Sequence, residues 1–148
     1  PIPKIVFYSV LLKDNITILL KSIQWIDDDK TETELITKAR YQKNGDKIKI
    51  SYDDTSATGF EGSVTDIEVE GEKNTTVMRS GTTNSLITLE PEKKHYCHYE
   101  TPYGDMQIGV YTHKIENKLE TEKSLYMKYT IDINSAYVSD NEIILEIK

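Results

Sequence analysis

The sequence predicts an all-β protein, an antiparallel up-and-down barrel of about eight to ten strands. Runs of residues alternate between apolar and polar side chains, and turn residues separate these runs at intervals of about eight to twelve residues. Ten tyrosines stand against two phenylalanines and one tryptophan, and tyrosine favours a half-buried pleated surface. Closure into a barrel is favoured because it removes the exposed edges of so many strands.

Length and composition limit the class of protein. A chain of 148 residues fits one domain, so we expect residues 1–148 to form a single barrel domain. The net charge of −7 argues against nucleic acid and anionic lipid as partners, and no apolar run approaches the roughly 20 residues that span a membrane. The single cysteine, Cys97, excludes an internal disulfide and predicts a reducing, cytoplasmic location. Composition leaves the oligomeric state open.

The first elements are the least regular. Residues 1–12 are apolar without a clear period, which is compatible with an edge strand or a covering arm. In the run from Ile16 to Trp25 the apolar positions change sides, which predicts a bulged or doubly buried strand. Asp27, Asp28 and Asp29 then form a solvated turn, because the glycine and distal glutamate of a calcium loop are absent.

The middle of the chain predicts hairpins. Asn44-Gly45 joins strands at Thr33–Gln42 and Asp46–Asp53. A loop at 54–62, with two glycines and small polar residues, could fold over something. Three further strands follow it, at Ser63–Glu70, Asn74–Ser80 and Thr83–Glu90.

The hairpin from Lys94 to Thr112 allows two registers. A type I turn followed by a left-handed Gly104 would place Cys97 opposite Gly109, whereas a four-residue turn would place Thr101 opposite Gly104. A slip of one residue exchanges the two faces, and the sequence leaves the choice open. Beyond it, Leu125 to Ile133 alternates most clearly of all, and the last strand covers Ile143 to Ile147.

Three stretches resemble a known family. They are Ser51-Tyr52-Asp53-Asp54 with Gly59-Phe60-Glu61-Gly62, then Met78-Arg79-Ser80-Gly81, and then Tyr99-Glu100-Thr101-Pro102-Tyr103-Gly104. In this order and spacing they are similar to the YwiB-like proteins of Gram-positive bacteria, a domain of unknown function. The resemblance runs from about Ile16 to Lys148 and leaves residues 1–15 as an N-terminal extension. It implies a lipocalin-like (calycin) barrel whose lumen could hold a small ligand, and it brings no catalytic residues.

Signatures of catalysis or metal binding are mostly missing. The chain has no nucleophile elbow, phosphate-binding glycine loop or paired cysteine motif. His95, Cys97 and His98 cluster on one strand with His113 on the next, but three or four convergent ligands are not established. We therefore expect no metal, no cofactor and no catalytic residue.

Arg79 is the candidate ligand-binding residue. It shares a strand face with Val77, where a residue that fills the barrel is expected, and a buried guanidinium needs a carboxylate, carbonyl or aromatic partner. Glu100 is the predicted mate, with Tyr52 and Tyr99 as hydrogen-bonding neighbours. The alternative is a structural ion pair that closes one end of the barrel.

Three functions follow from these observations. The leading hypothesis is a noncatalytic binder of a small, partly apolar or anionic ligand in the lumen. The second is an enzyme of the calycin type that uses the Tyr, Arg and Glu cluster, an inference from fold analogy. The third is a protein-interaction module that uses the acidic outer strand with Asp66, Glu68 and Glu70.

Overall fold

The computed structural model describes residues 14–101 and 104–148, and ten antiparallel strands form most of it. Within those two ranges there is no helix, and hence none long and apolar enough to cross a membrane. The predicted N-terminal arm, residues 1–12, lies outside the described residues. The strands are β1 Ile16–Ile26, β2 Asp29–Asn44, β3 Lys47–Asp53, β4 Ser63–Glu70, β5 Asn74–Gly81, β6 Ser85–Leu89, β7 Lys94–Thr101, β8 Gly104–Lys118, β9 Ser124–Ile133 and β10 Ala136–Ile147.

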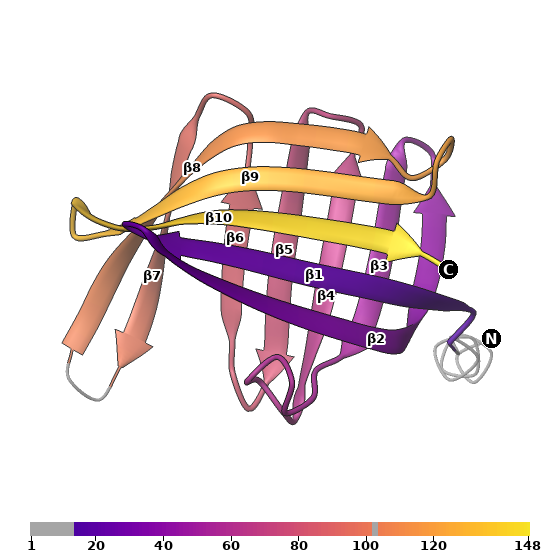
Figure 1. Cartoon of the computed structure of the whole chain (residues 1–148), viewed down its shortest axis with the longest axis horizontal. Helices are drawn as coiled ribbons and strands as arrows, with labels where there is room; N and C mark the ends of the chain where they lie inside the picture. The colour runs from indigo at the N-terminus through magenta and orange to yellow at the C-terminus, as the bar shows by residue number, and fades with distance from the viewer. Residues whose placement is uncertain (1–13, 102–103) are drawn as a thin grey trace, which may run out of the picture.

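The strands form a nearly closed up-and-down barrel, as the alternation predicted. Their order is β6-β5-β4-β3-β2-β1-β10-β9-β8-β7, so β1 pairs with both β2 and β10. In Figure 1 the strands β3 to β6 cross behind β1, β2, β9 and β10. The long β2 belongs to both layers, since it pairs with β1 up to Ala39 and with β3 from Arg40 onward.

The ring is completed next to β6. The segment that follows this strand hydrogen-bonds to Thr112 of β8, with Glu92 N donating to Thr112 O over 2.8 Å and Thr112 N donating to Lys93 O over 3.2 Å. The hairpin of β7 with the first part of β8 extends away from the barrel (Figure 1). Closure therefore depends on a short contact beyond β6 and not on a full β6–β7 ladder.

The two predicted hairpins have defined registers. At the end of β2, Asn44 pairs with Lys47, so Gly45 and Asp46 form the turn, and Gly45 has φ +62°. In the second hairpin Thr101 lies opposite Gly104 and Cys97 opposite Ile108. The strands are therefore paired in the register predicted for a hairpin without a bulge.

Of the two alternatives predicted for β1, the bulge was wrong. Every residue from Ile16 to Ile26 pairs in one register with β2. The inward side continues from Leu20 to Ser22 and Gln24, which line a cavity that Ile23 also borders. The change in the sequence pattern is therefore a change of polarity on the inward face and not a change of face.

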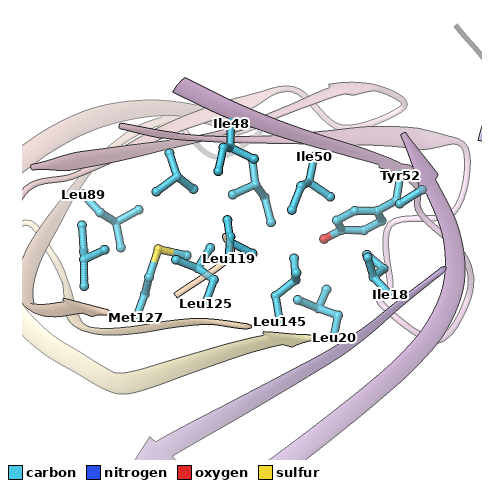
Figure 2. Packing of buried hydrophobic residues seen from close by; sticks show 14 of the residues in the cluster. Ile18, Leu20, Ile48, Ile50, Tyr52, Leu89, Leu119, Leu125, Met127 and Leu145 are labelled. Carbon is cyan, nitrogen blue, oxygen red and sulfur yellow. The ribbon is translucent and has the colours of Figure 1, made fainter. Parts of the chain in front are cut away.

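One end of the barrel is filled with buried side chains, most of them apolar. Ile48, Val69, Thr75 and Leu89 lie directly opposite one another on β3 to β6, and we call them the filled row. Figure 2 shows Leu119, from the turn after β8, at the centre of the surrounding buried side chains. Leu119 is only 3% exposed. Any hollow in the barrel must therefore lie beyond the filled row.

Candidate functional site: a polar cluster at the open part of the lumen

Two further rows of inward residues follow the filled row. The apolar row consists of Ile50, Ile67, Val77 and Ile87, and the Arg79 row consists of Tyr52, Thr65, Arg79 and Ser85. Members of successive rows are two residues apart on each strand, and a strand repeats its side-chain direction every two residues. The prediction that Arg79 faces inward beside Val77 is therefore confirmed, since both residues line the cavity.

The cavity beyond the filled row has a volume of about 420 Å³. This size lies within the range of roughly 300–1,000 Å³ that is common for small-molecule sites. Its apolar wall includes Leu20, Leu35, Ile67, Val77, Ile87, Ile131 and Ile143. Its polar wall includes Ser22, Gln24, Thr31, Thr33, Tyr52, Thr58, Arg79, Tyr129, Asn141 and Glu142. The lumen is thus apolar towards the filled end and polar around Arg79.

Arg79 is held at one edge by a buried carboxylate. Its Nε lies 3.5 Å from Asp54 Oδ2, and it donates a hydrogen bond to Thr65 Oγ1 over 3.0 Å. Thr65 in turn donates to Asp54 Oδ2 over 2.6 Å. The Asp54 side chain is fully buried, whereas the Arg79 side chain keeps 18% of its surface exposed. The pair therefore exposes the cation and conceals the anion.

The loop between β3 and β4 covers the cluster, as its composition suggested. The ring of Phe60 lies against the guanidinium, with Arg79 Cζ 3.7 Å from the ring centroid, which is a cation–π contact. From the same loop, Thr58 donates to Asp54 Oδ1 over 3.0 Å. Gly59 and Gly62 flank Phe60 with φ of +82° and +88°, conformations that glycine adopts without strain. This backbone brings Phe60 over the lumen.

Two tyrosines border the same space. Burial raises the pKa of Tyr129 to about 12, although the nearby Arg79 opposes this shift. Burial and the Asp54 charge also raise the pKa of Tyr52. Figure 2 shows the Tyr52 hydroxyl pointing into the barrel. Because both phenols hold their protons at neutral pH, they are able to donate hydrogen bonds to a guest.

The structure brings together two of the four predicted site residues. Tyr52 and Arg79 both line the cavity. The structure does not describe the side chains of Tyr99 and Glu100. The carboxylate beside Arg79 is that of Asp54.

Sequence reasoning missed four members of the cluster: Asp54, Phe60, Thr65 and Tyr129. Asp54 and Phe60 stand in the stretches that carried the family resemblance, which was a usable signal. Thr65 and Tyr129 could have been found from alternation, because they share the inward faces of Ile67 and Met127.

His95, His113 and Cys97 have separate environments, and the structure does not describe the side chain of His98. His95 Nε2 lies 2.9 Å from Glu90 Oε1, and His113 Nε2 lies 2.6 Å from Thr130 Oγ1. Burial raises the pKa of the Cys97 thiol. Among the residues that the structure describes, no group of three or more His, Cys, Asp or Glu side chains could hold a metal ion.

The acidic strand β4 is partly neutralised by its neighbour β3. Lys47 Nζ lies 3.7 Å from Glu68 Oε1 and 3.9 Å from Glu70 Oε2. Asp66 accepts a hydrogen bond from Ser51. These contacts reduce the uncompensated negative charge that a basic partner would recognise.

Comparison with known proteins agrees with this architecture. The family model described as "Domain of unknown function (DUF1934)" matches residues 18–145. The crystal structure of the ywiB protein from Bacillus subtilis superimposes with a TM-score of 0.70 at 22% sequence identity, covering 95% of this chain and 97% of that one. At this identity the likeness concerns the fold. No curated protein sequence gives a significant match.

Proposed function

Because the chain belongs to the family described as "Domain of unknown function (DUF1934)", no activity comes with its membership, and we propose a function from its own geometry. The protein is a noncatalytic binder of a small, partly apolar molecule in the barrel lumen. The sequence also allowed an anionic ligand, a point that depends on the charges at Arg79.

The division of the lumen into an apolar and a polar part carries this proposal. A cavity of about 420 Å³ extends past the apolar row to Leu89 of the filled row at one side and to Arg79, Tyr52 and Tyr129 at the other. Ligand sites typically combine apolar walls with a few convergent polar groups that fix orientation. A barrel that merely needed a core would fill this space with side chains, as the filled row does.

The state of the carboxylate supports a noncatalytic role. Asp54 accepts hydrogen bonds from Thr58 and Thr65, and its side chain is fully buried. A general base must come within hydrogen-bonding reach of the proton that it removes. Asp54 is closed off from the lumen and therefore serves to hold Arg79.

The setting that we propose is a reducing cytoplasm. Its support is the single cysteine, Cys97, which is unpaired and half-buried. Fractionation of the cells that make this protein, followed by immunoblotting, tests the location. Recovery in the membrane or secreted fraction would contradict it.

Binding in the lumen is tested with a neutral probe. N-Phenyl-1-naphthylamine fluoresces when it leaves water, so the wild-type protein should enhance its emission in a saturable way. Val77→Phe fills the apolar row and should abolish the enhancement, whereas Met78→Phe, on the outward face and 43% exposed in the wild type, should preserve it. Circular dichroism of both variants checks that they fold.

Native mass spectrometry supplies the second test. Protein purified from its own cells under gentle conditions should carry a noncovalent adduct that Val77→Phe lacks. A bare chain mass, together with probe fluorescence that is the same for both variants, would overturn the proposed function.

A further inference from the structure

The lumen has no excess positive charge before any ligand enters. Arg79 is the one cation among the described residues that line the cavity, and Asp54 lies 3.5 Å from its Nε. A second acidic residue, Glu142, also lines the cavity, and its carboxylate accepts a hydrogen bond from Tyr126. The Asp54 side chain is fully buried, so solvent screens the attraction little. A ligand carboxylate beside Arg79 would therefore be the second anion on one cation. The site would then carry an uncompensated negative charge next to the apolar row.

The unused hydrogen-bonding capacity of the cluster consists of donors. A guanidinium has five N–H groups, and the one on Nε is taken by Thr65. Among the described side chains, the Tyr52 hydroxyl is a further polar group in hydrogen-bonding contact with the guanidinium, which still leaves most of its N–H groups for a ligand. Tyr52 and Tyr129 add hydroxyl groups on the same wall. A ligand that satisfies these groups must offer acceptors.

We propose, on the basis of the ligand-binding function above, that the lumen takes an uncharged molecule with a carbonyl-type acceptor and an apolar body. An amide, ketone, ester or lactone oxygen has two lone pairs, which match the terminal edge of the Arg79 guanidinium. Such a group satisfies the donors without adding charge to the Arg79–Asp54 pair. Its apolar body then lies along Val77 and the rest of the apolar row.

The rows also set the length of that body. The Arg79 row lies two rows from the filled row, which corresponds to four residues, or about 13 Å along a strand. Thr75 and Val69 of the filled row are fully buried, and Leu89 is the member of this row that lines the cavity. The ligand is therefore compact, comparable with an octyl chain or a small ring system, and not a long-chain lipid.

Octanamide and octanoate test this assignment, because they have the same length and differ mainly in charge. Each is titrated at pH 7 against the wild-type protein loaded with N-phenyl-1-naphthylamine, with displacement as the readout. We expect octanamide to bind at least about tenfold more tightly than octanoate, since the carboxylate meets the Asp54 charge across the guanidinium. Palmitamide should displace the probe poorly.

Asp54→Asn gives the decisive comparison. It removes the internal anion, leaves Arg79 uncompensated and should reverse the preference, so that octanoate binds more tightly. The double variant Arg79→Met/Asp54→Asn lacks both charges and should bind octanamide about tenfold more weakly while it still binds the neutral probe. Should Asp54→Asn fail to fold, this double variant still provides the test.

The outcomes separate the ligand class from the function. Tighter binding of octanoate by the wild-type protein would overturn the assignment of a neutral ligand, as would failure of both compounds to displace the probe. In either case probe binding that Val77→Phe abolishes would leave the lumen-binding function standing. Absence of probe binding by the wild-type protein would instead contradict the proposed lumen-binding function itself.

Discussion

The side-chain amide of Asn117 on β8 donates a hydrogen bond over 3.0 Å to the backbone carbonyl of Gly71, a residue 46 positions earlier in the chain. The backbone N of Asn117 also donates to Glu72 Oε2 over 3.2 Å, and its Oδ1 accepts from Leu119 N over 3.1 Å. This one residue therefore joins the β4–β5 turn to β8 and fixes the backbone of Leu119 at the filled end.

Replacing Asn117 by Ala should lower the free energy of unfolding by about 1–3 kcal/mol, because two side-chain hydrogen bonds are lost together. Urea denaturation at constant m-value measures the change. Asn117→Asp serves as the comparison, since it keeps the acceptor for Leu119 N but cannot donate to Gly71. It also places a second anion near Glu72 and should be no more stable than the Ala variant. Wild-type stability in both variants would show that the side-chain hydrogen bonds of Asn117 do not stabilise the fold.

The Arg79–Asp54 pair should be strongly coupled in stability. Arg79→Met alone leaves a fully buried carboxylate without its cation, and such losses cost about 3–5 kcal/mol. Arg79→Met/Asp54→Asn removes both charges and should be more stable than the single Arg79→Met variant. A double-mutant cycle by chemical denaturation measures the coupling. Additive changes would mean that the two side chains do not act as a pair.

Tyr129 should make the protein sensitive to alkaline pH. Its pKa is about 12 in the folded chain, against about 10 when unfolded. Above pH 10 the unfolded state therefore loses this proton first, and stability falls as the pH rises towards 12. The loss reaches about 2–3 kcal/mol for a shift of this size.

Tyr129→Phe should flatten this decline between pH 10 and 12 in thermal or urea unfolding. Tyr96→Phe, at a position that is 55% exposed, controls for loss of a phenol at the surface. The same slope for Tyr129→Phe and the wild type would contradict the assignment.

Gly81 should tolerate no side chain. Its φ is +123°, and a Cβ there would lie 2.6 Å from the backbone O of Gly62 and 3.0 Å from Ser63 Cα. Backbone cannot move aside cheaply, so Gly81→Ala should cost about 2–4 kcal/mol in thermal or urea unfolding.

Gly59→Ala is the matched control, because Gly59 also has a positive φ, +82°, but its Cβ would have no neighbour within 4 Å. It should cost about 1 kcal/mol, for backbone strain alone. Equal costs at the two sites would show that the close approach of β5 to Gly62 does not matter.

Local patterns were sufficient for the strands and their faces. Alternation in Leu125 to Ile133 predicted β9, and the same rule placed Arg79 on the inward face of Val77. Period two is a local property of an extended chain, and any closed sheet of these strands preserves it.

Those local patterns could not predict contacts between residues that are far apart in the sequence. Asp54 reaches Arg79 from a loop that is 25 residues earlier, and Phe60 does so because Gly59 and Gly62 direct the loop over the lumen. The β1 pattern was misread for a related reason: an inward face is expected to be apolar, and only a hollow barrel explains Ser22 and Gln24 there.

The sequence by itself determined that this protein is made of paired strands, where most of them turn, and that Arg79 points inside. Tertiary structure decided that Leu119 fills one end, that the other part stays hollow, and that Asp54 neutralises Arg79. The physical reason is that strand formation and side-chain direction depend on neighbouring residues. Charge pairing and cavity volume depend instead on how all ten strands close around one another.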